Sequence, residues 1–395
     1  MDKLRVGVDG ACWRNRRGYG RYTRSLLTAL AARADGERYL LFADPETAAD
    51  PDIPSGVEKV IVPTRRPPAQ AASAWGRRAV PDLWRMAQAV AQQRVDVFFF
   101  PSVSTFFPLL RAVPTVVTIH DVIAERHPKM VFAARRFELF WWLKLRLAVH
   151  QARMILTVSD HARAGIIEHF RLSAERVRVV LEAPAPIFRP LPHPDDPADL
   201  LPGCGLARGG RYLLYVGGLS PHKNLSLLID AYRALLREGD FAGLYLLLVG
   251  DYAGDVFYSA YADLRAQVQA YGLVNRVLFT GFVPDEALLH LYNRAELVVL
   301  PSMEEGFGLP AIEAAACGRP VVASEVGPMG RLLGEGIRTF PLQDRAVLTE
   351  ILGTLLRDPV RRRAMGSEAR RRAEAFTWDR AAQRVQALFR EVYGA

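Results

Sequence analysis

Residues 301–320 combine the residue types that could bind an anion next to a polyol. Gly306 and Gly308 precede a proline, which is favoured in the first turn of a helix. Glycines let a ligand approach the backbone, and the N–H groups and dipole of a helix start attract phosphate. Glu305 stands at the mouth of this loop and Glu313 lies one helical turn inside, where carboxylates can accept hydrogen bonds from hydroxyls. A diphosphate on the amides and a sugar on the carboxylates would make the ligand a sugar nucleotide.

A lysine earlier in the second half could reach the same phosphates. The run Tyr-Val-Gly-Gly-Leu-Ser-Pro-His-Lys-Asn reads as a strand end, a turn and a helix start, with Gly218 in the turn and Lys223 before the helix. The alternative for this lysine is a solvated side chain at a helix start.

The first half offers two further positions, each after an apolar run. Gly18 and Gly20 lie between the first run and a helix that contains Tyr22, so they form a flexible loop without the third glycine of a dinucleotide fingerprint. His120 and Asp121 follow a later run, where the imidazole could bind a sugar hydroxyl or orient an acceptor. The alternative for His120 is a structural residue that caps a loop.

Apolar runs alternate with helical patterns along the whole chain, which predicts α/β folding with parallel, doubly wound sheets. In the first half we expect strands at 4–9, 39–43, 58–62, 95–100, 115–120, 154–158 and 178–181, and helices at 20–33, 82–94, 134–151 and 161–170. In the second half we expect strands at 212–216, 245–249, 277–280, 297–300, 321–323 and 338–340, and helices at 225–237, 258–271 and 285–294. The stretch 184–210 holds seven prolines and reads as a connector, so we expect domains at 1–188 and 189–376. Two such domains facing a cleft would bind ligands at the carboxyl ends of their strands.

Composition narrows the class of protein. The chain has 395 residues, enough for two domains, and its three cysteines are widely spaced, as in a reducing compartment. The start of the chain enters a strand directly and no apolar run approaches about 18 residues, so we expect a cytoplasmic protein. The formal charge of +9 lies in the first half, which carries +10 over residues 1–188 and so suggests an anionic partner. We expect no metal, because Asp50 and Asp52 lie among prolines in a loop.

The two glutamates around Gly-Phe-Gly-Leu-Pro, with seven residues between them, resemble the donor-binding signature of retaining glycosyltransferases of family 4, which have the GT-B fold of two Rossmann-like domains. The resemblance extends to the elements around Gly20, His120 and Lys223, and to a last helix, about 377–395, that returns to the first domain. The chain departs from the family at Gly218, where an arginine is usual. The donor-binding residues implied are Gly18, Gly20, Gly218, Lys223, Gly306, Phe307, Gly308, Leu309, Pro310, Glu313 and Val283.

The resemblance also implies a reaction. A hexose, mannose or glucose, would pass with retention from a GDP- or UDP-sugar to a glycan or glycolipid precursor, without a metal or another cofactor. Glu305, His120 and Lys223 would be catalytic: Glu305 would bind sugar hydroxyls, Glu313 the ribose, and Lys223 the diphosphate as its charge develops. Asp121 and Tyr22 could contact or orient the acceptor.

The acceptor has its own sequence signal. Residues 133–149 are aromatic, basic and helical in spacing, and with Arg65, Arg66, Arg77 and Arg78 they suggest an anionic membrane face and a lipid-linked acceptor. The protein would then be peripheral at the inner membrane face. A helix buried against the first sheet, with arginines reaching outward, explains the same pattern.

Other functions remain open. An epimerase or a phosphorylase would keep the fold, and a non-catalytic nucleotide-sugar scaffold would explain the missing arginine at Gly218. A nicotinamide dehydrogenase lacks its Gly-x-Gly-x-x-Gly, and nucleic-acid binding is not expected because the aromatics lie in core-like runs.

Overall fold

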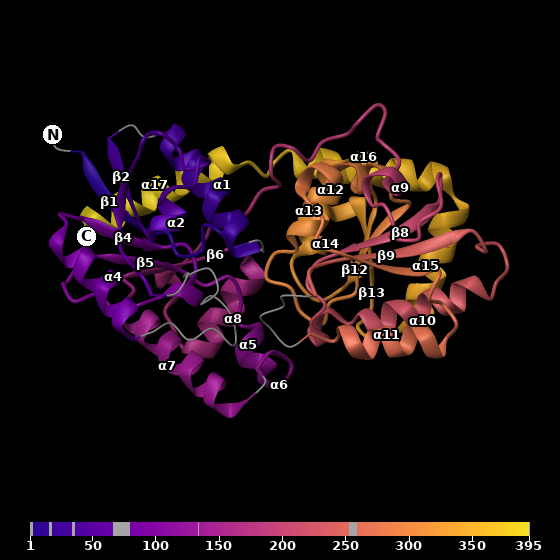
Figure 1. Ribbon diagram of the computed structural model, residues 1–395, viewed down its shortest axis with the longest axis horizontal. Helices are drawn as coiled ribbons and strands as arrows, with labels where there is room; N and C mark the ends of the chain where they lie inside the picture. Colours follow the sequence, from indigo (N-terminus) through magenta and orange to yellow (C-terminus); the bar gives the residue numbers. More distant parts are fainter. Residues whose placement is uncertain are drawn as a thin grey trace. The chain divides into compact units, whose positions relative to one another are not determined.

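The computed structural model describes residues 3–15, 18–33, 36–65, 80–132, 134–252 and 259–394. The chain forms two compact units, one of Met1–Glu182 with Thr377–Ala395 and one of Ala183–Phe376. Each unit has one parallel sheet of its own (Figure 1). Arg66, Arg77 and Arg78, which the acceptor hypothesis used, lie outside the described residues.

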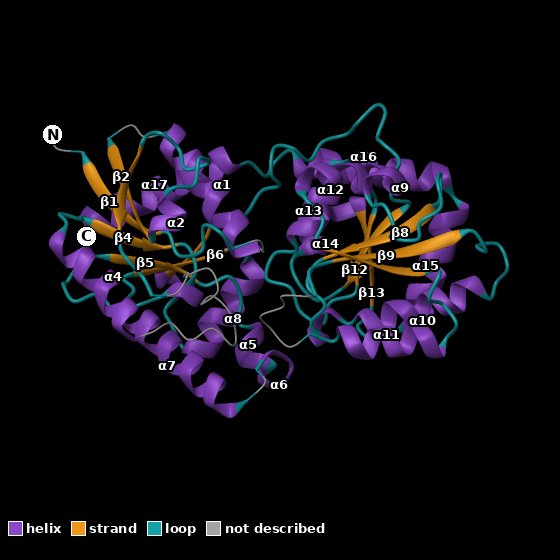
Figure 2. Ribbon diagram, viewed as in Figure 1, coloured by secondary structure: helices purple, strands orange, loops and turns teal. Residues whose placement is uncertain are grey.

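The first unit contains a sheet of seven parallel strands in the order β3-β2-β1-β4-β5-β6-β7. The strands are β1 Leu4–Asp9, β2 Glu37–Ala43, β3 Val57–Ile61, β4 Val97–Phe100, β5 Thr115–Thr118, β6 Met154–Thr157 and β7 Val177–Val179. The inner strands β4, β5 and β6 are buried at every residue, because helices cover both faces of the sheet. This confirms the parallel, doubly wound prediction for the first half (Figure 2).

Helices connect these strands. They are α1 Gly18–Ala32, α2 Pro45–Ala48, α4 Val80–Gln92, α5 Ile123–Arg126, α6 Pro128–Val131, α7 Arg135–Gln151 and α8 Asp160–Phe170. Met86 and Val90 of α4 and Leu145 and Ala148 of α7 join one hydrophobic cluster with strand residues such as Phe98. Helices α4 and α7 therefore cover the same face of the sheet.

The C-terminal helix α17, Trp378–Gly394, packs in the first unit against α1, β4 and β5 (yellow in Figure 1). Phe389 is fully buried, with its ring centroid 5.4 Å from that of Phe99. Arg390 pairs with Glu37 at 2.7 Å, and Gln386 donates to the same carboxylate at 3.2 Å. A buried carboxylate needs such partners, so these contacts fix the position of α17.

The second unit contains a sheet of six parallel strands in the order β10-β9-β8-β11-β12-β13, the order of dinucleotide-binding folds. The strands are β8 Arg211–Val216, β9 Leu244–Val249, β10 Val277–Gly281, β11 Leu297–Leu300, β12 Val321–Ser324 and β13 Ile337–Phe340. The helices are α9 Pro197–Leu200, α10 Leu225–Leu236, α11 Tyr261–Ala270, α12 Asp285–Arg294, α13 Leu309–Ala316, α14 Met329–Leu333, α15 Arg345–Arg357 and α16 Pro359–Ala373. The two sheets together confirm the predicted fold class.

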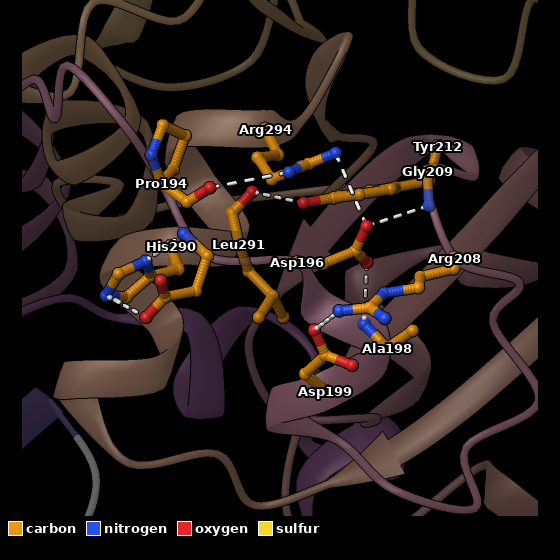
Figure 3. A network of polar contacts seen from close by, with 11 residues as sticks. Pro194, Asp196, Ala198, Asp199, Arg208, Gly209, Tyr212, His290, Leu291 and Arg294 are labelled. Carbon is orange, nitrogen blue, oxygen red and sulfur yellow. Dashed lines mark hydrogen bonds and ion pairs between the residues drawn. The ribbon is translucent and has the colours of Figure 1, made fainter.

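The proline-rich stretch 184–210 is tied to α12 by polar contacts (Figure 3). His290 accepts a hydrogen bond from the backbone N–H of Asp195 at 2.7 Å, and Arg294 lies 3.6 Å from the carboxylate of Asp196. Asp196 also accepts from the backbone of Ala198 and Gly209, and these bonds, with the nearby arginines, lower the pKa of its carboxyl. Although rich in proline, the stretch is therefore a docked part of the second unit.

No helix among the described residues is long and apolar enough to cross a membrane.

Replacement of Phe389 by alanine should lower the free energy of unfolding of the first unit by about 3–5 kcal/mol, because the residue leaves a cavity between α17 and the sheet. Urea denaturation measures the change. Tyr393→Ala on the same helix is the matched control, since Tyr393 is 57% exposed and its loss should change stability by about 0.5 kcal/mol or less. Equal effects of the two substitutions would show that α17 is not held by this contact.

Candidate active site

The predicted anion cradle lies after β11, where the chain turns through Gly308 into α13. Gly308 has a φ of +84°, a left-handed conformation that favours glycine. A Cβ atom here would lie 2.6 Å from Sδ of Met329, so the methionine side chain would have to move to admit one. Pro310, which has no N–H, occupies the first turn of α13, and the N–H groups of Ala311 and Ile312 bond to the carbonyl of Gly308 at 2.9 and 3.4 Å. The dipole of α13 still favours an anion at the start of the helix.

Buried apolar side chains anchor the same loop. Phe307 and Leu309 are both buried, and Phe307 meets Phe376 edge-on with ring centroids 6.2 Å apart. Since these residues flank Gly308, they hold the glycine turn in place on both sides.

Glu305 is fixed through one of its two carboxylate oxygens. Lys223 donates to Oε1 at 2.6 Å, and the hydroxyl of Ser302 donates to the same oxygen at 2.7 Å. The other oxygen, Oε2, has no hydrogen-bond partner among the residues that the structure describes. The side chain of Glu305 is only 12% exposed, and Lys223 supplies a positive charge beside it. This arrangement leaves Oε2 able to accept from a ligand hydroxyl.

Ser302 is a functional candidate that the sequence analysis missed. It is fully buried, and its carbonyl accepts a bond of 2.5 Å from the hydroxyl of Ser324 at the end of β12. The signal available in the sequence was its position directly after the strand that precedes the cradle, but serine is common at strand ends. Only the contact with Glu305 singles it out.

Lys223 lies on the loop after β8, and β8 is next to β11 in the sheet. The carbonyl of His222 accepts from the backbone N–H of Met303 at 2.8 Å, so the two loops are bonded directly to each other. The side chain of Lys223 is 19% exposed and paired with Glu305, which is not the state of a solvated lysine.

Gly218 has space around it among the described residues. Of their atoms, a Cβ atom at Gly218 would meet only Oγ of Ser220, at 3.9 Å, and the φ of Gly218 is not in the left-handed region. The backbone therefore does not require glycine at this position, and an arginine side chain could be accommodated.

Glu313 and Val283 are enclosed. Glu313 has no exposed surface, and Tyr292 donates to its Oε2 at 3.0 Å. Val283, after β10, is 4% exposed. Glu313 lies in α13, directly after the cradle, and Val283 follows another strand, β10. Contact of either residue with a nucleotide stays a prediction.

His120 lies in the first unit, just after β5, among aromatic and acidic neighbours. Its Nε2 donates to the carbonyl of Pro101 at 3.1 Å, and its Nδ1 lies 3.4 Å from Glu182. The ring of Tyr22 meets it edge-on at 4.8 Å. Glu182 was not anticipated, since it comes from a loop far along the sequence that the strand order brings to this edge.

Tyr22 and Asp121, the predicted acceptor residues, have structural contacts in this unit. Tyr22 is 1% exposed, and burial raises the pKa of its hydroxyl. Asp121 accepts from the backbone N–H of Ile123 at 3.1 Å and so supports the start of α5.

The two glycines predicted in a loop lie instead in the first turn of α1, and they differ in their surroundings. A Cβ atom at Gly20 would lie 1.8 Å from the carbonyl oxygen of Asn15, whereas one at Gly18 would meet no atom of the described residues within 4 Å. Gly20 is thus required for the close packing of α1 against the segment before it.

Among the described residues, no group of three or more His, Cys, Asp or Glu side chains could hold a metal ion. Asp50 uses its carboxylate to accept from the backbone N–H of Asp52 at 2.9 Å, which stabilises the turn.

Two family models match this chain in succession. The model described as Glycosyltransferase Family 4 matches residues 16–181, and the model described as Glycosyl transferases group 1 matches residues 204–372. O-antigen chain mannosyltransferase B of Escherichia coli is 32% identical over 306 residues, which are 75% of this chain and 74% of that protein. The chain therefore belongs to the family 4 glycosyltransferases.

Solved structures agree on the fold. Sucrose-phosphate synthase from Thermosynechococcus elongatus matches with a TM-score of 0.75 and 22% identity, over 99% of this chain and 100% of that one. Anabaena HepE in complex with UDP and glucose matches with a TM-score of 0.72 and 20% identity, over 98% and 99% of the two chains. Both likenesses confirm the GT-B fold.

Gly20→Ala should lower the stability of the first unit by about 1–3 kcal/mol, because the new methyl group collides with the backbone at Asn15. Thermal or urea unfolding measures this. The matched control, Gly18→Ala, should change stability by about 1 kcal/mol or less, since the position is open. If both variants are as stable as the wild type, the packing role of Gly20 is excluded.

Proposed function

We propose that this glycosyltransferase transfers a hexose, mannose or glucose, with retention and without a metal, from a nucleotide-diphosphate sugar to a glycan or glycolipid precursor. The observation that carries the proposal is Glu305, bound through Oε1 to Lys223 and Ser302 beside the start of α13. Such a site has a carboxylate for sugar hydroxyls, a cation and a helix start for phosphate. Two comparisons support a nucleotide-diphosphate hexose as the donor. The Escherichia coli relative is named a mannosyltransferase, and HepE was solved in complex with UDP and glucose.

The proposed reaction is a front-face displacement. The acceptor oxygen bonds to the anomeric carbon as the bond from that carbon to the β-phosphate oxygen breaks, and the departing phosphate oxygen takes the acceptor proton. Lys223 and the start of α13 would stabilise the charge that develops on the diphosphate. Glu305 would hold the sugar through Oε2, so it is a binding group and not the nucleophile.

In this proposal the second unit, Ala183–Phe376, which contains the predicted donor domain 189–376, binds the donor, and the first unit binds the acceptor. His120 would contact the sugar or the acceptor, and its position is set by Pro101 and Glu182. Lys223 and the segment 306–312 would bind the phosphates, Gly18 and Gly20 would touch the sugar or a phosphate, and Val283 would lie near the nucleotide base. Glu313 would bind the ribose, which requires its enclosure to open.

The first test is release of nucleotide diphosphate from a panel of UDP-, GDP- and ADP-hexoses, without acceptor and with EDTA present. We expect slow release from one donor, and a loss of about 10²–10³-fold in Glu305→Gln with free-nucleotide binding retained. Loss of activity in EDTA would contradict metal independence. No release from any donor, and no thermal shift with any nucleotide, would favour a non-catalytic scaffold; an epimerised donor would favour an epimerase.

Restoring the missing arginine gives a second test. Gly218→Arg should lower the Kd for the donor by about tenfold, because a guanidinium makes charge-assisted bonds to phosphate and the position has space. Calorimetric titration of the wild type, Gly218→Arg and the uncharged control Gly218→Ala measures the effect. If the arginine variant binds no better than the alanine variant, position 218 does not face the diphosphate.

A further inference from the structure

Helix α7 carries an apolar face that the described residues of its own unit leave exposed. Leu145 and Ala148 are its buried residues, and they point into the core of the first unit. On the opposite side, residues spaced by three and four along the helix are exposed: Leu139 at 64%, Phe140 at 68%, Leu143 at 49% and Leu147 at 42%. An isolated exposed leucine is ordinary, whereas four large apolar side chains on one helical face indicate a binding surface.

Unpaired arginines border this face. Arg136 and Arg146 are exposed on the same side of α7, and neither forms an ion pair with a carboxylate among the described residues. The guanidinium of Arg146 lies 5.0 Å from the ring centroid of Trp142, which is itself half-exposed. An apolar and aromatic stripe bordered by free cations is the composition of a helix that lies in a lipid interface.

The neighbouring helix extends the surface. Helix α4 covers the same face of the sheet as α7, and its outward side carries Val80, 76% exposed, and Trp84, 55% exposed. Tryptophan side chains are enriched at the level of the lipid headgroups, so an exposed tryptophan suits a surface that docks on a membrane.

We propose that the outer face of α7, with Val80 and Trp84 of α4, docks on a bilayer surface that contains anionic lipid. A second copy of the chain fits this surface less well, because a symmetric pair would bring the same arginines of both copies together without a compensating carboxylate. Anionic headgroups match the arginines, and the acyl boundary matches the leucines and Phe140.

The position of α7 in the unit gives this surface a consequence for the acceptor. Lys144 donates to the carbonyl of Ser104 at 2.8 Å, and Trp141 donates to Glu125 at 2.5 Å, so α7 is tied to the loops that follow β4 and β5. His120 lies in one of these loops. This consequence rests on the proposed function: the acceptor would be an amphiphile whose head group enters the transferase site from the lipid surface.

The test is flotation of the full chain with vesicles of phosphatidylcholine alone and with about a quarter phosphatidylglycerol. We expect binding to the anionic vesicles only. Phe140→Ser with Leu143→Ser should weaken partitioning at least about tenfold, because two apolar side chains no longer leave water. Arg136→Gln with Arg146→Gln should weaken it about tenfold at low salt and little at about 0.5 M salt.

Val274→Ser with Val360→Ser is the matched control, since these residues are 56% and 67% exposed in the second unit and should not affect flotation. Donor-nucleotide release should be unchanged in all three double variants, so loss of docking is separable from loss of the transferase site. Wild type that does not float with anionic vesicles, or variants that float as well as it does, would overturn the proposal. So would a concentration-dependent dimer in light scattering that Phe140→Ser with Leu143→Ser abolishes.

Discussion

The candidate site depends on one constraint: a nearly buried carboxylate must be neutralised or fully hydrogen-bonded. Glu305 meets this requirement by sharing a single oxygen between Lys223 and Ser302. Since Lys223 follows β8 and Ser302 follows β11, the ion pair also joins two loops that are distant in sequence. The glycine turn at Gly308 can be narrow because both of its flanks are held. What remains available for a ligand is one carboxylate oxygen and a helix start.

The strand orders explain why these residues meet. In the second unit β8 lies next to β11, where the direction of strand addition reverses, and ligands of doubly wound sheets bind at that reversal. The first unit has the same reversal between β1 and β4, and Gly18 and Gly20 lie in the first turn of α1, the helix that follows β1. Each unit therefore has glycines in a segment that follows a strand at the reversal.

Much of the fold and of the candidate site could be predicted from the sequence, because local residue patterns indicate both. Strands such as β1 and β11 have the predicted bounds, since continuous apolar runs between turn signals define buried parallel strands. The glutamate pair and its glycines were visible from spacing alone. Ser302 and Glu182 were not, because a partner across a sheet depends on strand order and has no local signal. The enclosure of Glu313 by Tyr292 was hidden for the same reason, and no helix was predicted where α15 and α16 lie.

We expect Ser302 to act through Glu305 by fixing which carboxylate oxygen faces the ligand. A double-mutant cycle on donor turnover tests it most directly, with Ser302→Ala, Glu305→Gln and the double variant. We expect Ser302→Ala alone to lower kcat by about tenfold or more, the value of one hydrogen bond to a charged group, with circular dichroism unchanged. In the Glu305→Gln background the serine substitution should cost almost nothing. Equal losses in both backgrounds would mean that Ser302 acts independently of Glu305, and the account of the site would be wrong.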